Sequence, residues 1–300
     1  MKHDRWRHDP AHYTARYDIP TRYADVDTLR HLNNSALHGL HQEARMRFLA
    51  ERIGDGFWRE RGPRLRPSRV VTDFLLQSHY PKPLQAAVRV TALDAQQVTL
   101  DSALFQDGAC VGLQSTRLHA RLHGEAGELP AAWQSALDSP VPAPAAALPP
   151  AAPAPAAFEA YPLRRELDTR YADLDATGRV GEGALMRGAE TGRSAVMQNA
   201  FAALGGEGER ATVGLLVARV DLHILAWRAL PPRWRLGAGV THRGRSSAVV
   251  RVGFFDGQPQ AAAGADCVLV FVDRERGQPL PMPEAVRAAL DAQRVQAGHR

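Results

Sequence analysis

The sequence predicts an α+β fold made of two copies of one unit, each an antiparallel sheet wrapped round a long central helix. The first observation is a repeat: residues 21–27 read TRYADVD and residues 169–175, at an offset of 148, read TRYADLD. The second is a shared order of apolar patterns, one strand, one long helix and four strands. The offset holds over most of each half, which favours duplication over a chance match. It also relates Ala36-Leu37 to Ala184-Leu185, Arg45 to Arg193, and Asp73 to Asp221.

An Ala- and Pro-rich segment separates the two halves. Residues 138–157 read DSPVPAPAAALPPAAPAPAA, a composition that cannot build a packed core and is typical of a semi-rigid, polyproline-like spacer. We therefore expect an N-terminal domain over residues 1–137, a linker over 138–157 and a C-terminal domain over 158–300.

Composition excludes several classes of protein. The 300 residues suit about two domains, and 45% apolar with 23% charged residues excludes wholesale disorder. No apolar run reaches the ~18 residues of a membrane span. The polar residues 1–10 lack the apolar core of a secretion signal. Cys110 and Cys267 provide no disulfide framework and no four-cysteine metal site. We expect a cytoplasmic protein without metal or cofactor.

The chain carries a net charge of +5, which suits acidic partners such as nucleic acid, phosphorylated cofactors or acidic carrier proteins. A nucleic-acid surface would interleave cations with exposed aromatic residues. The one dense arginine cluster lies in a predicted loop with Trp58 alone beside it, so we expect no nucleic-acid partner. A solvated surface and a phosphate site remain the alternatives for this cluster, which comprises Arg59, Arg61, Arg64, Arg66 and Arg69.

The first half begins with a strand and a long helix. Apolar and polar residues alternate over residues 13–19, which predicts a strand, and a polar loop follows. Asn33 or Asn34 can cap the helix, and Gly54 can end it. The apolar residues that recur at helical spacing, and should be buried, are Leu37, Leu40, Ala44 and Phe48.

Four strand-like runs follow the helix in each half. In the first half they are residues 69–80, 84–93, 97–106 and 109–123, with a hairpin turn at Asp107-Gly108. In the second half a strand ending near Thr169 and a helix over 182–203 come first, then runs at 212–227, 233–243, 246–255 and 258–273. Short helices are expected at 130–137 and 283–293. The glycines at 205, 206 and 208 indicate a loop rather than a nucleotide-binding motif.

Residues 23–34, YADVDTLRHLNN, resemble the helix-entry motif of hotdog-fold thioesterases of the 4-hydroxybenzoyl-CoA and acyl-carrier-protein (ACP) branches. That motif reads approximately aromatic-x-D-x-D-x-x-x-H-V-N-N. Residues 42–45 are similar to the E-E-A-R helix signature there, and Tyr80-Pro81 with Pro83-Leu84 to a Y-x-x-P-L strand end. The tandem arrangement is similar to double-hotdog thioesterases. The resemblance implies two tandem hotdog domains and hydrolysis of an acyl-CoA or acyl-ACP thioester.

The chain departs from the family pattern at several positions. Arg30 replaces the usual Gly before the His, Leu37 the usual Tyr after the two Asn, and Leu29 an Asn common in the carrier-protein branch. The second copy has Arg179 in place of the His and Gly181-Glu182 in place of the two Asn. We therefore expect the first copy to be catalytic and the second to be structural or substrate-binding. The second copy retains Tyr171, Asp173, Asp175 and Gly178.

By this resemblance Asp27 is the general base or nucleophile, and the first turn of the following helix stabilises the thioester oxygen. His31 orients water or protonates the leaving thiolate, and Asn33 or Asn34 holds the water or the carbonyl. Each residue also has a structural interpretation. Asp25 and Asp27 can satisfy loop N–H groups, one Asn can serve only as a cap, and His31 can be solvated.

Other candidates lie further from the motif. Glu43 is either a second acid or an ion-pair partner of Arg47 four residues on. Asp175, without a His, is more readily a relic than a catalyst. The sequence contains no G-x-S-x-G, H-E-x-x-H or P-loop motif. The expected substrate-binding residues are Tyr23, Arg64, Arg66 and Asp175.

Three functions stay open on the sequence alone. The first is acyl-thioester hydrolysis, the second a non-catalytic acyl-thioester-binding or scaffold protein, and the third a hydratase on the same fold. The expected partner is an acyl-CoA or acyl carrier protein, not a membrane. The tandem copies are compatible with a monomer that is an internal pseudo-dimer and with a homo-oligomer.

Overall fold

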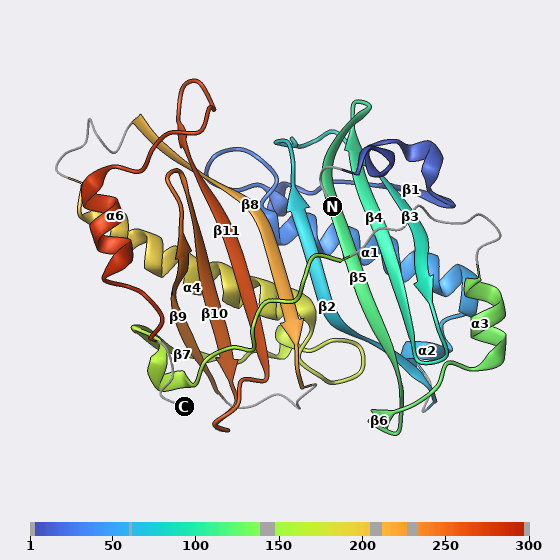
Figure 1. Ribbon diagram of the computed structural model, residues 1–300. Coiled ribbons are helices and arrows are strands. Elements are labelled where there is room, and N and C mark those ends of the chain that lie inside the picture. Colours follow the sequence, from blue (N-terminus) through green and yellow to red (C-terminus); the bar gives the residue numbers. More distant parts are fainter. Residues whose placement is uncertain (1–3, 60–61, 139–147, 205–211, 227–232, 297–300) are drawn as a thin grey trace. The chain divides into compact units, whose positions relative to one another are not determined.

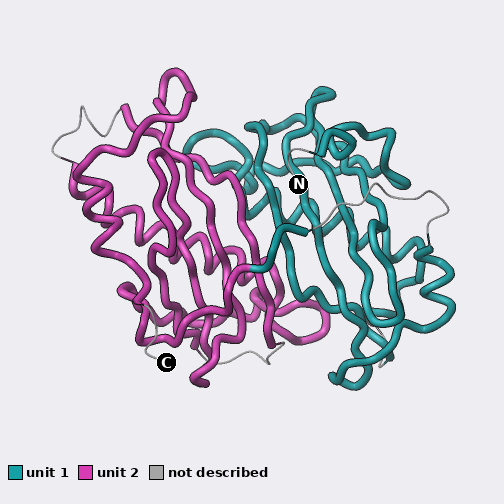
Figure 2. The backbone as a smooth tube through the Cα atoms, viewed as in Figure 1, with its two compact units in different colours: residues 1–151 teal, residues 152–300 magenta. Residues whose placement is uncertain are grey.

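The computed structural model describes residues 4–59, 62–138, 148–204, 212–226 and 233–296. It divides the chain into two units, Met1–Ala151 and Ala152–Arg300 (Figure 2). Three predicted features lie wholly or partly outside the described residues: the linker, at residues 139–147, Arg61, and the glycine loop at 205–208.

Unit 1 is an antiparallel sheet packed on one long helix (Figure 1). The sheet order is β1-β3-β4-β5-β2, with β6 beside β5. Two strands coincide with the predicted runs, and the helix begins and ends where the sequence predicts. The elements are β1 (Ala15–Ile19), α1 (Asn34–Ile53), α2 (Gly56–Arg59), β2 (Arg64–Phe74), β3 (Leu84–Leu93), β4 (Gln97–Gln106), β5 (Ala109–Leu122), β6 (Glu125–Ala126) and α3 (Ala131–Leu137).

Unit 2 repeats this plan. Its sheet order is β8-β11-β10-β9-β7, and α4 packs on the sheet as α1 does in unit 1. Each unit therefore has the hotdog arrangement that the sequence predicts. Among the described helices, none is both long and apolar enough to cross a membrane. The elements are β7 (Leu163–Asp168), α4 (Glu182–Ala202), β8 (Val213–Ile224), β9 (Arg233–Arg243), β10 (Ser247–Phe255), β11 (Ala263–Asp273) and α6 (Glu284–Asp291).

Local signals explain how the elements of unit 1 begin and end. Asn33 is the N-cap of α1, and its Oδ1 accepts a hydrogen bond from the Ser35 N–H at 2.7 Å. Gly54, with φ of 75°, ends the helix in a conformation that favours glycine. Asp107 and Gly108 have φ of 51° and 80°, as a tight hairpin turn requires.

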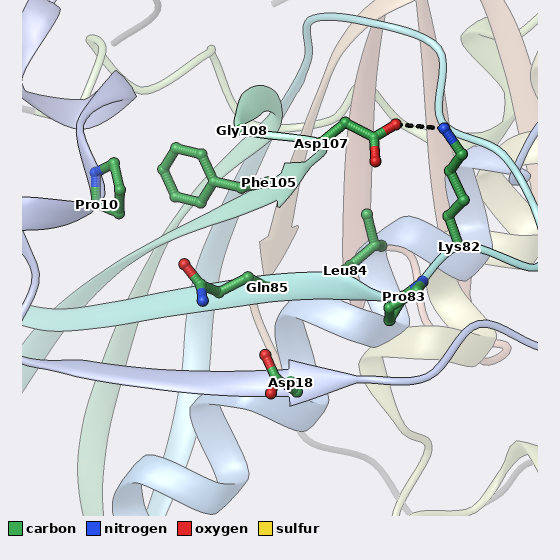
Figure 3. Close-up of a pocket in the computed structure, with 9 residues that line it drawn as sticks. All are labelled: Pro10, Asp18, Lys82, Pro83, Leu84, Gln85, Phe105, Asp107 and Gly108. Carbon is green, nitrogen blue, oxygen red and sulfur yellow. Dashed lines mark hydrogen bonds and ion pairs between the residues drawn. The ribbon is translucent and has the colours of Figure 1, made fainter.

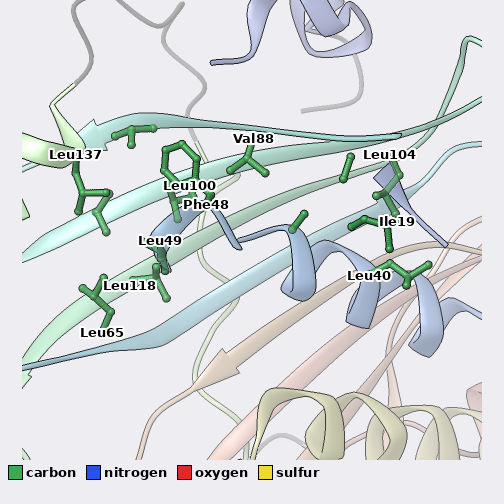
Figure 4. Packing of buried hydrophobic residues seen from close by; sticks show 14 of the residues in the cluster. Ile19, Leu40, Phe48, Leu49, Leu65, Val88, Leu100, Leu104, Leu118 and Leu137 are labelled. Atoms are coloured by element: carbon green, nitrogen blue, oxygen red, sulfur yellow. The ribbon is translucent and has the colours of Figure 1, made fainter. Parts of the chain in front are cut away.

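The apolar core of unit 1 lies between α1 and the sheet (Figure 4). Leu40, Phe48 and Leu49 of α1 pack in one buried cluster with residues of β3, β4 and β5 such as Val88 and Leu100. All four helix residues that the sequence marks as apolar and periodic are buried. Burial of such side chains stabilises the fold by about 1.5–3 kcal/mol each.

The helix of unit 1 also buries polar side chains against the sheet. His41 Nδ1 lies 2.8 Å from Ser102 Oγ, and Arg45 Nη1 donates to Gln114 Oε1 at 3.0 Å and Thr116 Oγ1 at 2.8 Å. The equivalents of His38, His41 and Arg45 at the offset of 148 are Met186, Ala189 and Arg193. The polar layer is thus mainly a property of unit 1, and the apolar periodicity of α1 does not predict it.

An N-terminal segment covers the other face of the unit 1 sheet. Asp101 and Ser115 alternate along their strands with Ser102 and Gln114, which face α1. Arg7 is fully buried, donates to Ser115 Oγ at 3.0 Å and forms an ion pair with Asp101 at 3.5 Å. The sequence predicts none of this, because the segment is polar and aperiodic.

The arginine cluster requires a correction. The sequence places it in a loop and begins the next strand only at residue 69, but β2 begins at Arg64, so Arg64 and Arg66 also belong to that strand. The pairing of β2 with β5 shifts register between Pro67 and Arg69, and this bulge with a proline hides the strand from pattern analysis. Arg69 Nη1 donates to the Pro149 carbonyl at 2.7 Å, which ties the predicted linker to unit 1 at a residue inside the linker.

Candidate active site

The loop between β1 and α1 carries the predicted motif. A short 3₁₀ turn, Tyr23–Asp25, opens it. Asp25 is buried, and its carboxylate accepts hydrogen bonds from the Arg22 backbone N–H at 2.9 Å and from the Arg22 guanidinium at 2.8 and 3.2 Å. The Asn33 N–H donates to the Asp25 carbonyl at 2.7 Å. Asp25 therefore holds the loop against the start of the helix.

Asp27 organises a tight turn in the same loop. Its Oδ1 accepts hydrogen bonds from the backbone N–H groups of Leu29 (2.8 Å) and His31 (3.2 Å). Its own N–H donates to the His31 carbonyl at 2.8 Å. Within the described residues its Oδ2 has no hydrogen-bond partner, and the side chain is half-buried. One carboxylate oxygen thus shapes the loop while the other stays available.

The first turn of α1 lies directly after this loop. The side-chain oxygen of Asn33 caps the helix by accepting from the Ser35 N–H, and Asn34 is the first helical residue. In the part of the chain that the structure describes, the backbone N–H groups of Asn34 and Ala36 have no acceptor. The positive end of the helix dipole adds to these donors. This terminus can stabilise negative charge on an oxygen.

His31 meets a second imidazole that sequence reasoning missed. The rings of His31 and His79 lie edge to face, with centroids 5.1 Å apart. His79 comes from the connection between β2 and β3, which bonds to the loop where the Leu32 N–H donates to the Ser78 carbonyl at 2.9 Å. The Gln106 side chain holds the backbone of His79. Its Oε1 accepts from the His79 backbone N–H at 2.8 Å, and its Nε2 donates to the His79 carbonyl at 2.9 Å. The only sequence signal was the nearby Tyr80-Pro81 match, because a loop residue has no periodicity.

The remaining predicted residues lie elsewhere. Glu43 is exposed and forms an ion pair with Arg47 at 2.7 Å. Of its two interpretations, a second acid or an ion-pair partner, this contact agrees with the second. Tyr23 is 78% exposed and its ring contacts Tyr80. Arg64 and Arg66 lie near the start of β2, whereas the His79 segment follows its end. At ~3.3 Å per residue, Arg66 and Arg64 lie about 26 and 33 Å along the strand from its last residue, Phe74.

The loop of unit 2 has the same backbone with different chemistry. Asp175 Oδ1 accepts from the N–H groups of Thr177 (2.8 Å) and Arg179 (3.2 Å), as Asp27 Oδ1 does from Leu29 and His31. Gly178 has φ of 71°, and Arg30, at the equivalent place, has φ of 66°. Turn formation is therefore common to both aspartates. What distinguishes unit 1 is His31 and the Asn pair.

A cavity of about 360 Å³ in unit 1 is lined by residues outside this loop (Figure 3). Asp18, Gln85 and Phe105 line it, and an ion pair between Lys82 and Asp107 spans one side. None of the predicted site residues lines it. It therefore gives no information about a thioester bound at Asp27.

Comparison with known proteins defines the class of fold. No family model and no curated protein matches the chain. Among solved structures, an acyl-ACP thioesterase from Bacteroides thetaiotaomicron is similar, with a TM-score of 0.65 and 12% identity over 86% of this chain and 97% of that one. A 12:0-ACP thioesterase from Umbellularia californica gives a TM-score of 0.65 and 12% identity over 86% and 94%. The chain thus has the tandem hotdog fold of acyl-ACP thioesterases.

Proposed function

We propose that the protein hydrolyses an acyl thioester, delivered by CoA or by acyl carrier protein, at the β1–α1 loop of unit 1. The observation that carries the proposal is the Asp27 carboxylate, with one oxygen fixed by the loop and the other available beside the N-terminus of α1. The fold that the chain shares with acyl-ACP thioesterases supports the same class of reaction.

The residues of the loop suit each step of hydrolysis. Asp27 Oδ2 takes a proton from water as the water oxygen attacks the thioester carbon. The N–H groups at the start of α1 stabilise the negative oxygen of the tetrahedral intermediate. The C–S bond then breaks, and His31 supplies the proton that converts the leaving thiolate to a thiol. In the alternative, Asp27 attacks the carbon directly and the C–S bond breaks, which releases the thiolate and gives an anhydride that water then hydrolyses.

Asp27→Asn tests the proposal with a matched control in the same chain. Asn keeps an oxygen that accepts the two loop N–H bonds but is not a base, so we expect release of free thiol from acyl-CoAs and acyl-ACPs to fall by about 10²-fold or more. Asp175→Asn makes the same change in the equivalent turn of unit 2, where Arg179 stands in place of the His, and should lower the rate far less than Asp27→Asn. Equal rates for Asp27→Asn and wild type would overturn the proposal.

Non-catalytic thioester binding is the second candidate. The observation that favours it is that Asp27 and Asp175 form the same turn, so the carboxylate has a structural role in both units. Tight binding of acyl-CoA or acyl-ACP with no thiol release over a series of chain lengths would support this function instead.

A further inference from the structure

Strands β2 and β5 of unit 1 lie side by side and carry a row of basic side chains where β2 begins and β5 ends (Figure 1). Leu65, Leu118 and Ala120 belong to the apolar cluster beneath α1. Because side chains alternate between the two faces of a strand, their neighbours lie on the face away from the helix. These half-buried neighbours, which we call the basic stripe, are Arg64, Arg66, Arg117, His119 and Arg121.

The antiparallel register sets basic residues of the stripe opposite one another. Directly opposed side chains have Cβ atoms about 5 Å apart, and like charges at such positions destabilise a sheet. The fold alone therefore gains nothing from this arrangement. The opposed pairs are Arg64 with Arg121, Arg66 with His119 and, past the bulge, Arg69 with Arg117.

The strands beside β5 add no carboxylate to the stripe. Gln97 and Thr99 of β4 pair with its last basic residues, and Ala126 of β6 pairs with the final arginine. The nearby turn carries Asp94, whose carboxylate already accepts hydrogen bonds from the Gln96 N–H at 2.8 Å and from the Gln97 side chain at 2.7 Å. At the described positions that pair directly with the stripe, the residues are thus basic or neutral.

The imidazole of His119 responds to the positive charge of the stripe. Burial, and then the charges of Arg121 and Arg117, lower its pKa, although Asp94 acts in the opposite direction. The guanidinium groups themselves stay protonated at any physiological pH. Because they are half-buried, salt screens their field less than it would screen fully exposed charges.

Unit 2 has the same strand pairing without these charges. Its β8–β11 pair shifts register between Val268 and Leu269, as the β2–β5 pair does beside Pro67. The hotdog sheet thus forms without basic residues at these places, so the stripe is a feature of unit 1 alone. Counted from the bulge, the two outer basic pairs of unit 1 correspond to Leu216–Val270 and Gly214–Val272.

We infer that the basic stripe is a docking surface for a partner protein that presents an acidic α-helix. Alternate residues of a strand lie about 6.6 Å apart, so the stripe is about 13 Å long on β5 and only two strands wide. Carboxylates four residues apart on a helix recur about every 6 Å, which matches that spacing. Guanidinium groups bind carboxylates through paired hydrogen bonds.

The shape of the stripe favours a helix over other polyanions. An anionic membrane would contact a broad surface rather than a narrow row, and single-stranded nucleic acid would stack its bases on aromatic side chains, which the stripe lacks. The docking surface is independent of hydrolysis at Asp27.

Fluorescence anisotropy with the full chain and a labelled peptide tests the inference. The probe is a helix-forming Ala-rich peptide with Glu at every fourth position, ~16 residues and about 24 Å long as a helix. We expect saturable binding that weakens about tenfold or more in Arg117→Gln with Arg121→Gln. Binding should also weaken as salt shortens the Debye length to ~3 Å at 1 M. A peptide with Lys in place of Glu should not bind.

A charge-matched variant is the control. Arg164→Gln with Arg165→Gln removes the same net charge from exposed positions of β7 and should bind as the wild type does. Thermal melting checks that each variant is folded. Equal losses in the two double variants, or no saturable binding by the wild type, would overturn the inference.

Two further probes test the kind of partner. A peptide of equal charge with a central proline, which breaks the helix, should bind more weakly than the helical probe. Equal binding of the two peptides would refute recognition of a helix. Binding of phosphatidylserine vesicles without binding of the peptide would replace the protein partner by a membrane surface and so overturn the inference.

Discussion

The imidazole rings of His31 and His79 meet edge to face, with centroids 5.1 Å apart and planes at 76°. His31 belongs to the loop that carries Asp27, and His79 to a separate connection fixed by Gln106. The contact therefore couples the orientation of the predicted proton donor to a distant part of the chain.

We predict that His79 positions His31. His79→Ala should lower kcat roughly tenfold or more with little change in KM, because a displaced catalytic group is costly. His79→Phe keeps the edge-to-face contact and should recover most of kcat. Steady-state thiol release measures both constants, with the exposed His242→Ala as the control. A His79→Phe variant as slow as His79→Ala would contradict a positioning role.

Arg30→Gly should stabilise the protein. Arg30 holds φ of 66°, a left-handed conformation that disfavours a β-carbon, and unit 2 has Gly178 there. Relief of this strain should raise the free energy of unfolding by about 0.5–1 kcal/mol relative to Arg30→Ala. Denaturant unfolding compares the two variants. The converse change, Gly178→Ala, should destabilise by a similar amount. Equal stability of Arg30→Gly and Arg30→Ala would contradict the prediction.

The buried His41 should make stability depend on pH. Burial, together with the positive charges of His38, Arg45 and Arg7, holds the pKa of His41 well below 6.5. Below pH ~6.5 the unfolded chain takes up a proton at this residue that the folded chain does not, so the contribution favours unfolding as pH falls. In His41→Asn, which can still bond to Ser102, Tm should fall less between pH 8 and 5.5. Parallel Tm curves for wild type and variant would argue against it.

Arg7→Ala should be strongly destabilising. It leaves the Asp101 carboxylate buried, where burial already raises its pKa despite Arg7, and removing one partner of a buried ion pair costs about 3–5 kcal/mol. Replacing both partners, as Arg7→Met with Asp101→Leu, should be milder than Arg7→Ala alone. Urea unfolding gives the free energy of unfolding of the wild type, of Arg7→Ala and of the double variant. Arg16→Ala, on the exposed side of β1, is the control.

The sequence predicts the fold well wherever a local signal acts alone. Asn33 caps α1, Gly54 ends it, and Asp107-Gly108 turns the hairpin, as the sequence predicts. It fails where a long-range contact decides the structure. Pro67 lies in a bulged strand that appeared to be a loop, and Arg7 is buried although its segment is polar.

In the candidate site too, the sequence predicts the features that local hydrogen bonds decide and misses those that depend on long-range contacts. The loop around Asp27 follows from its motif, because the hydrogen bonds that shape it are local. His79 could not be found by pattern, since it matters through a neighbour distant in sequence, His31. The roles of Asp27, His31 and the two Asn stay predictions.

The hydrogen bond of His41 beneath α1 shows how far the two copies have diverged. Two copies that began as interchangeable parts now carry incompatible interiors, since Ala189 of α4 cannot replace the imidazole that contacts Ser102. A chimaera with α4 transplanted into unit 1 would leave the Ser102 hydroxyl without its imidazole partner. The two helices are therefore not interchangeable, although they hold equivalent places in the two units.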